Sequence, residues 1–213
     1  MLILGIETAT AVSGCALGGP DGVIARLSVA RGRHHAELLI PQIRTICDMA
    51  AIDLSDVRVV AVDVGPGLFT GLRVGLATAK GLAHALGVPM VGVPSLDLLA
   101  FPFRHSARKV VVVIDARRGE VYHAAYRAVP GGLQRVDDHS VSSPEALAAD
   151  LMAGGEEVLL AGDGARRYRD HFSDMAHVEL VDDGEGHPSA ASLVALAHAA
   201  AVREEFHRPD EVQ

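Results

Sequence analysis

The feature that most constrains this chain is the segment of residues 64–87, where a strand pattern runs through a Gly-Pro-Gly turn into a long apolar helix. Residues 59–64 form a short apolar run, which is typical of a strand buried on both faces. Glycine and proline then end the strand, and Thr70 is placed to cap a helix over residues 70–86. The segment therefore predicts one strand–turn–helix unit of an α/β fold.

The predicted helix is small or apolar around most of its circumference, with a polar strip of only Arg73, Lys80 and His84. A helix on the surface of a sheet needs one buried stripe, so we expect a second partner on its other side. Glycine inside a helix costs about 1 kcal/mol relative to alanine, and three glycines indicate close backbone approach. We expect a subunit interface here, with Leu38 and Met49 of the preceding helix at its rim and these residues within it: Gly71, Leu72, Val74, Gly75, Thr78, Ala79, Gly81 and Leu82.

The order of predicted elements indicates a duplicated fold. The first half reads as strands 2–6, 13–18 and 23–29, helix 34–52, strand 58–64, helix 70–86, strand 90–93 and a short helix capped by Ser95. The second reads as strands 109–115, 120–128 and 133–141, helix 144–152, strand 157–161 and helices 166–172 and 188–206. Three strands, helix, strand and helix, given twice, is the plan of the actin, Hsp70 and sugar-kinase (ASKHA) superfamily. We expect two α/β, ribonuclease H-like βββαβα lobes with mixed sheets, at residues 1–103 and 104–213.

Four motifs resemble one family. Residues 65–73 (GPGLFTGLR) resemble the GPGSFTGLR signature of the TsaB (YeaZ) family, with Leu68 in place of the usual serine. Three further segments match in family order, namely residues 5–10 (GIETAT), 93–96 (VPSL) and 115–122 (DARRGEVY). The resemblance is dense over residues 2–127 and thin beyond them.

The resemblance implies a non-catalytic scaffold for the threonylcarbamoyl (t6A) modification of the adenosine beside the anticodon of tRNA. Family members pair with the catalytic paralogue TsaD and recruit the ATPase TsaE. A homodimer is expected when TsaD is absent, tRNA is met through the complex, and the protein is expected in the cytoplasm. No cofactor is expected to bind tightly to the chain alone, although ATP and magnesium can enter with the partners. The alternative is an ATP-dependent transferase or kinase of the same fold that acts by itself.

The first loop resembles a reduced phosphate-binding loop. In the superfamily, each half opens with a hairpin that grips nucleotide phosphate through a carboxylate, hydroxyls and backbone donors. The candidates here are Glu7, Thr8, Thr10 and Ser13. The equivalent turn of the second half keeps one glycine and carries Arg117 and Arg118, so a complete ATP clamp is not expected. A plain polar turn is the other interpretation of the loop.

The remaining reactive residues do not assemble a catalytic or metal site. His34 and His35 are adjacent, so they lack the one-turn spacing that aims two imidazoles at one ion, and polarity at a helix start explains them. This pattern speaks against an older glycoprotease hypothesis for the wider family. Cys15 and Cys47 lie in apolar patterns where thiols are inert. Asp63 follows a strand, and either a base, a metal ligand or a cap of the next turn fits that place.

The net charge of −8 disfavours dominant binding to nucleic acid, which uses clustered Lys and Arg. Two arginine clusters, Arg117-Arg118 and Arg166-Arg167-Arg169, can still contact phosphate, although arginines on solvated faces are the commoner case. No apolar run approaches the length of a membrane span.

Overall fold

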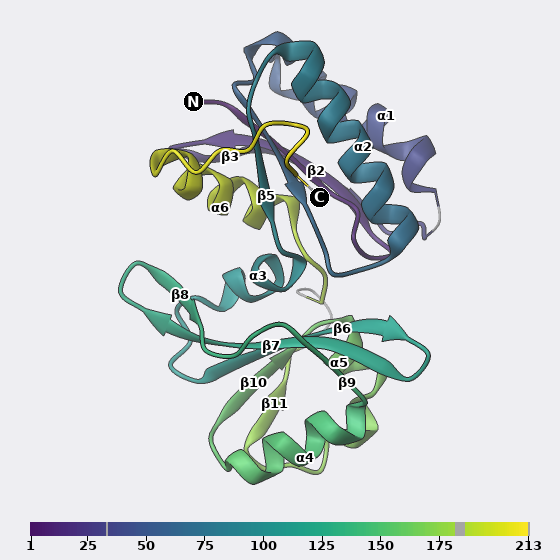
Figure 1. Ribbon diagram of the computed structural model, residues 1–213, viewed down its shortest axis with the longest axis vertical. Helices are drawn as coiled ribbons and strands as arrows, with labels where there is room; N and C mark the ends of the chain where they lie inside the picture. Colours follow the sequence, from purple (N-terminus) through teal and green to yellow (C-terminus); the bar gives the residue numbers. More distant parts are fainter. Residues whose placement is uncertain (33, 182–185, 213) are drawn as a thin grey trace. The chain divides into compact units, whose positions relative to one another are not determined.

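The computed structural model describes residues 1–32, 34–181 and 186–212, and the chain forms two compact units (Figure 1). The first comprises Met1–Leu98 with Pro188–Gln213, and the second comprises Leu99–His187. The expected boundary, which gave all of 104–213 to the second lobe, is therefore wrong for the C-terminal segment. The physical reason is that helix α6 (Ala190–Val202) buries Leu193 and Val194 against the sheet of the first unit.

The first unit is a five-stranded mixed sheet in the order β3-β2-β1-β4-β5. Its strands are β1 (Ile3–Glu7), β2 (Ser13–Gly19), β3 (Gly22–Val29), β4 (Val59–Asp63) and β5 (Met90–Val93). Strands β1, β4 and β5 are parallel, whereas β1-β2 and β2-β3 pair antiparallel. Helices α1 (His35–Ala50) and α2 (Phe69–Leu86) lie side by side on one face, and α6 covers the other (Figure 1). The first unit also contains the short helix η1 (Leu54–Asp56). Helix α3 (Ser95–Ala100) crosses into the second unit, and η2 (Phe101–Phe103) lies within the second unit.

Two hydrophobic cores lie on the opposite faces of the first sheet, which explains why its central strands β1 and β4 are buried at every position. Along β1, Leu4 and Ile6 pack beneath α1 and α2, while Ile3 packs against α6. Along β4, Val60 and Val62 face the first core, and Val59 and Ala61 the second. Successive side chains of a strand point to opposite faces, so a sheet covered twice needs a continuous apolar run.

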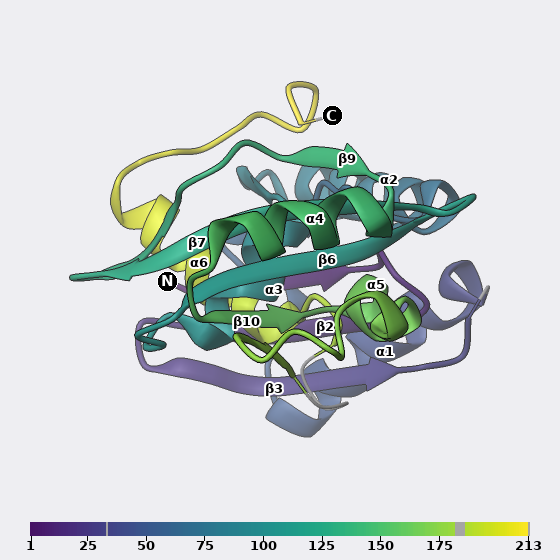
Figure 2. The same cartoon turned by 90° about the horizontal axis from the view of Figure 1, so that it is seen from below.

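The second unit repeats this plan with the strand order β11-β10-β6-β7-β8. Its strands are β6 (Lys109–Arg117), β7 (Glu120–Val129), β8 (Gly132–Arg135), β9 (Ser140–Ser142), β10 (Val158–Ala161) and β11 (Val178–Leu180). Its helices are α4 (Pro144–Gly154), α5 (Asp163–Arg167) and η3 (Arg169–His171). Helix α4 lies over β6 and β7 (Figure 2), and its Leu147 and Leu151 join Phe172 in one core.

The duplicated, actin-like α/β plan is confirmed, because β6, β7, β8, α4, β10, α5 and β11 follow the order and pairing of β1, β2, β3, α1, β4, α2 and β5. One predicted strand, residues 133–141, is instead two: β8 and β9 both pair with β7, at different positions. The polar residues Asp137 and Asp138 lie between them, and aspartate is depleted in strands. Among the described residues no helix is both long and apolar enough to cross a membrane.

Replacing Ser143 with alanine is expected to lower the free energy of unfolding by about 1 kcal/mol. Ser143 is the N-cap of α4, and its Oγ accepts a hydrogen bond of 3.2 Å from the backbone N–H of Ala146. Urea denaturation measures the change. Ser173→Ala, at an exposed serine outside the helices, is the control and should change stability by less than about 0.5 kcal/mol. Equal effects of both substitutions would contradict the capping role.

Candidate functional site

Two buried carboxylic acids lie at the carboxyl ends of neighbouring parallel strands in the first unit. Glu7 ends β1 and Asp63 ends β4, directly after the paired residues Ile6 and Val62. Both side chains are almost fully buried. Asp63 Oδ1 accepts hydrogen bonds from Ser95 Oγ at 2.5 Å and from the backbone N–H of Gly65 at 2.8 Å. Ser95 is thus a partner of Asp63 rather than the expected cap of α3.

The environment of these acids favours their protonated forms. Burial raises the pKa of Asp63 to about 7, and the two hydrogen-bond donors on its Oδ1 limit this rise. Burial and the neighbouring Asp63 raise the pKa of Glu7 well above its ordinary value, and Glu7 receives only the backbone N–H of Ala9, at 2.7 Å. Because Asp63 has more donors, it ionises first. The environment thus favours protonation of both acids, and more strongly of Glu7.

The loop after β1 uses its hydroxyl groups within the protein. Thr8 Oγ1 donates to the carbonyl oxygen of Gly71 at 2.8 Å. Thr10 Oγ1 accepts from the backbone N–H of Val12 at 3.4 Å. Ser13 Oγ accepts from Gln42 Nε2 at 3.2 Å. All three side chains are buried, so none of the predicted phosphate-loop hydroxyls points to open solvent.

The Gly-Pro-Gly turn packs directly on this loop. The backbone N–H of Leu68 donates to the carbonyl oxygen of Ala9 at 2.6 Å. A Cβ atom at Gly67 would overlap the same carbonyl group. A nucleotide phosphate needs close approach to loop backbone and free donors, and the turn occupies that space. The residues Glu7, Thr8, Thr10 and Ser13 therefore do not fit a nucleotide as they are arranged here.

Helix α2 buries a narrow stripe against this loop, and that stripe contains residues predicted to face a partner. Gly71, Gly75 and Ala79 are buried in the chain's own core together with Ala83. A Cβ at Gly71 would overlap the carbonyl oxygen of Thr8, and one at Gly75 would overlap Thr8 Oγ1. The interface assignment of Gly71, Gly75 and Ala79 is therefore wrong: their small size allows α2 to approach the loop after β1. Thr70 is not a cap either, because the helix begins at Phe69 and Leu68 caps it without a side-chain bond.

The exposed side of α1 and α2 carries several apolar residues and an unexplained glycine. Met49 is 80% exposed and Phe69 is 66% exposed, and Ile40 is also exposed. Gly81 lies exposed near the middle of α2, and among the described residues nothing comes within 4 Å of where its Cβ would be. We use the name helical face for the exposed residues Ile40, Met49, Phe69 and Gly81 of α1 and α2 together, of which Ile40 and Met49, nine residues apart, lie on opposite flanks of α1. Leu38, Leu72, Val74, Thr78 and Leu82 of the predicted set are half-buried beside it.

Sequence reasoning missed Ile40 and Phe69 as members of the helical face. The predicted helix over residues 70–86 leaves out Phe69, which begins α2 in the structure. The signal that could have found Phe69 is Arg73, one turn later, whose guanidinium carbon lies 3.7 Å from the centre of the Phe69 ring. Such stacking keeps an aromatic ring at the surface.

The adjacent histidines have separate structural roles. His34 Nδ1 lies 3.0 Å from a carboxylate oxygen of Glu37 at the surface. His35 is buried, and its Nε2 donates to the carbonyl oxygen of Thr10 at 2.7 Å. In the described part of the chain, no three His, Cys, Asp or Glu side chains are grouped so that they could hold a metal ion. Burial raises the pKa of Cys15 to about 12, so this thiol stays protonated at neutral pH.

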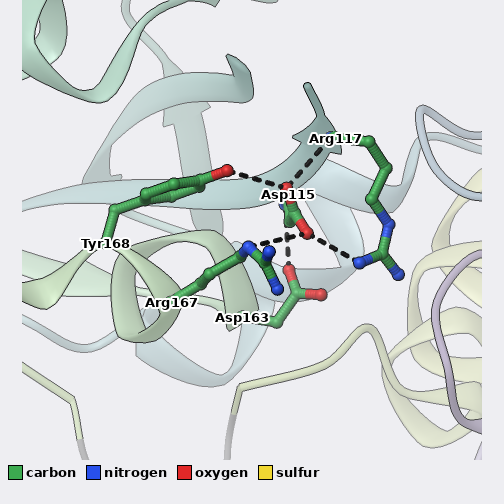
Figure 3. A network of polar contacts seen from close by, with 5 residues as sticks. All are labelled: Asp115, Arg117, Asp163, Arg167 and Tyr168. Atoms are coloured by element: carbon green, nitrogen blue, oxygen red, sulfur yellow. Dashed lines mark hydrogen bonds and ion pairs between the residues drawn. The ribbon is translucent and has the colours of Figure 1, made fainter. Parts of the chain in front are cut away.

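The second unit places a different polar cluster at the equivalent ends of its strands (Figure 3). Asp115 near the end of β6 and Asp163 after β10 are joined by a hydrogen bond of 3.1 Å from the backbone N–H of Asp115 to Asp163 Oδ1. Here, unlike at Glu7 and Asp63, arginines stand beside the acids. Arg117 Nη1 lies 3.1 Å and Arg167 Nε 3.5 Å from Asp115 Oδ2. The sequence did not reveal that Arg117 and Arg167, fifty residues apart, meet at one carboxylate.

Comparisons with known proteins agree with this geometry. Residues 23–206 match the family described as TsaD, tRNA N6-adenosine threonylcarbamoyltransferase. The tRNA threonylcarbamoyladenosine biosynthesis protein TsaB of Escherichia coli is 32% identical over 201 residues, which cover 92% of this chain and 86% of that protein. The structure of YeaZ from Pseudomonas aeruginosa superposes with a TM-score of 0.86 and 30% identity, covering 99% and 97% of the two chains. A 2-hydroxyglutaryl-CoA dehydratase component from Acidaminococcus fermentans shares the fold alone, with a TM-score of 0.57 and 12% identity over 95% and 99% of the chains.

Proposed function

The chain belongs to the TsaB family of tRNA threonylcarbamoyladenosine biosynthesis proteins, and on that premise we propose that it is the non-catalytic partner subunit of this pathway. In the proposal, it pairs with the catalytic paralogue TsaD, recruits the ATPase TsaE and forms a homodimer when TsaD is absent. It meets tRNA through this assembly, in the cytoplasm.

One observation carries the proposal: the glycine at position 81. A mid-helix glycine destabilises a helix by about 1 kcal/mol relative to alanine. Gly71 and Gly75 are explained by the loop that they touch, whereas the described residues of the chain give no steric reason for Gly81. A second helix that packs closely on α2 supplies one, because glycine lets two helix backbones approach. Met49 on α1 and Phe69 on α2 are further large apolar side chains left exposed on these two helices, and aromatic residues and methionine are enriched at interfaces.

The packing of the first loop supports a non-catalytic role. Its hydroxyls are committed to groups inside the chain, and the Gly-Pro-Gly turn fills the space above its backbone. We therefore propose that the lone chain binds no nucleotide tightly, and that ATP and magnesium act only in the assembly with partners. The alternative of a self-sufficient kinase or transferase requires saturable, micromolar binding of ATP and magnesium by the lone chain, which calorimetry measures.

Replacing Gly81 with leucine is expected to weaken association with TsaD at least tenfold, or about 1.4 kcal/mol. The added side chain enters open space in the lone chain, so the fold should stay intact while close helix packing is blocked. The measurement is copurification with tagged TsaD after co-expression, followed by titration of the purified proteins. Met49→Asp, at the exposed methionine of α1, should act in the same direction.

The chain offers a matched control for this experiment. Gly154 is also an exposed helical glycine, at the end of α4 in the second unit, with nothing within 4 Å of its Cβ position among the described residues. Gly154→Leu adds the same apolar side chain and should leave association unchanged. If Gly81→Leu and Met49→Asp both copurify with TsaD as the unchanged protein does, the helical face is not the interface.

A further inference from the structure

The turn between β6 and β7 carries arginines where its backbone favours other residues. Arg117 pairs with Glu120, which leaves Arg118 and Gly119 as a two-residue hairpin loop. Arg117, Arg118 and Gly119 all have positive φ, at 69°, 55° and 81°. Loops of this kind prefer Asn-Gly, because Cβ atoms are strained in the left-handed region. Folding of the hairpin alone therefore does not explain Arg118, and strain of this kind is typical of functional sites.

A second arginine-bearing segment meets this turn at one carboxylate (Figure 3). Arg117 reaches Asp115 Oδ2 from the hairpin, and Arg167 reaches the same oxygen from α5. Tyr168 OH donates to Asp115 Oδ1 at 3.4 Å, and the backbone N–H of Arg117 donates to it at 2.9 Å. Asp115 is buried and fixed by these contacts. Asp115 therefore fixes the positions of the two guanidinium groups.

Much of the surface of the two arginine side chains is exposed to solvent and accessible to a ligand. The side chains of Arg117 and Arg167 are 55% and 57% exposed, while Asp115 beneath them is 5% exposed. Each guanidinium has five N–H donors, and the ion pair with Asp115 engages only some of them. Arginines held in this way present a rigid fork that matches the oxygens of a phosphate.

Local charge favours an anion at this place despite the acidity of the whole chain. Residues 115–119 and 163–167 contain four arginines and two aspartates, an excess of two positive charges in a chain of net charge −8. A cationic patch on an acidic protein attracts polyanions selectively to that patch.

We propose that Arg117, Arg118 and Arg167 bind phosphate groups of the RNA backbone, so that this subunit contacts tRNA directly through its second unit. The inference rests on the proposed function, which brings tRNA to the assembly. An RNA backbone fits better than a nucleotide, because more than half of each guanidinium side chain is open to solvent on a hairpin and a short helix. A polymer with many phosphate groups can bind several exposed arginines at once, which raises its affinity. Such contacts do not depend on the base sequence.

The test titrates a labelled, unmodified tRNA transcript with the assembly of this chain and TsaD, and with the full-length chain alone at low salt. The double variant Arg117→Gln, Arg167→Gln should weaken binding at least tenfold and reduce the slope of log Kd against log salt by about 1 to 2. Arg203→Gln is the matched control, an exposed arginine of the first unit paired with Glu205. It should change neither quantity. Circular dichroism confirms that each variant is folded.

A second variant separates binding from structure. Arg118→Asn gives the loop its preferred residue, so the melting temperature should rise while affinity for tRNA falls several-fold. If Arg118 had only a structural role, the melting temperature would not rise while the affinity for tRNA falls.

Unchanged affinity and salt slope in the double variant would overturn the proposal. So would loss of ATP binding with tRNA binding retained, which would identify a nucleotide site. If the unchanged chain fails to assemble with TsaD, the proposed function fails instead, and the titration of the lone chain still decides the role of the arginines.

Discussion

Replacing Gly71 with alanine is expected to lower the free energy of unfolding by about 3 kcal/mol, the upper part of the range for an overpacked core. The new methyl group would overlap the carbonyl oxygen of Thr8 and lie 3.2 Å from the ring of His35. The carbonyl group belongs to backbone that directly follows β1 and cannot move aside. Movement of α2 instead would break the bond from Thr8 Oγ1 to Gly71. Urea denaturation at constant protein concentration measures the loss.

The same substitution at Gly81, on the exposed side of α2, should raise the free energy of unfolding instead of lowering it. Gly81→Ala places its methyl group in open space on the same helix, so it should raise stability by about 0.5 to 1 kcal/mol through helix propensity alone. Gly75→Ala should fall between them, because its clash is with a side-chain oxygen of Thr8 that can rotate away at the loss of its hydrogen bond. Equal effects at positions 71 and 81 would contradict the packing described here.

These glycines show what a helical pattern can predict and what it cannot. The prediction of close backbone approach is confirmed for Gly71 and Gly75, while for Gly81 it stays a prediction. The pattern did not say against what, because α2 is small or apolar on both sides of its polar strip. Gly71 and Gly75 meet a loop of their own chain, and only the topology, which brings the loop after β1 beside the start of α2, shows this.

The fold was predictable where local signals are strong. Apolar runs and Gly-Pro turns located nearly every strand, and Ser143-Pro144 located the start of α4. Strand β11 has three residues, which is too short for a pattern. Helix α6 is apolar nearly all round, so nothing in it points to the first sheet rather than the second. Its membership of the first unit depends on contacts distant in sequence.

The candidate site was predictable residue by residue but not as an arrangement. Glu7 was recognised from its motif, and of the three alternatives for Asp63 the cap of the following turn agrees with its bond from Gly65. The pairing of Glu7 with Asp63 follows from the parallel register of β1 and β4, which the sequence does not state. Arg117 and Arg167 were noted in separate clusters, and their convergence on Asp115 depends in the same way on β6 and β10 being neighbours.

The free energy of unfolding is expected to fall as pH rises from about 4 to about 8 through the contribution of Glu7 and Asp63. Asp63 has a pKa of about 7 in the folded chain, and the pKa of Glu7 is raised well above its ordinary value. In the unfolded chain both acids lose their protons near pH 4. Between these pH values the folded state binds more protons than the unfolded state, so stability decreases with pH. One such group contributes at most about 1.4 kcal/mol per pH unit.

Asp63→Asn isolates this contribution, because asparagine can accept the same bonds from Ser95 and Gly65 without ionising. Relative to the unchanged protein, the variant should gain stability steadily from about pH 5 to about pH 7, by a total of about 2 kcal/mol. Exposed acids with lowered pKa values, such as Glu145 and Glu205, act in the opposite direction in both proteins and cancel in the difference. Asp21→Asn, which removes the same charge from an exposed turn, is the control variant. A flat difference for Asp63→Asn would mean that the buried pair is ionised throughout, and the closed packing around it would then need a buried cation to explain it.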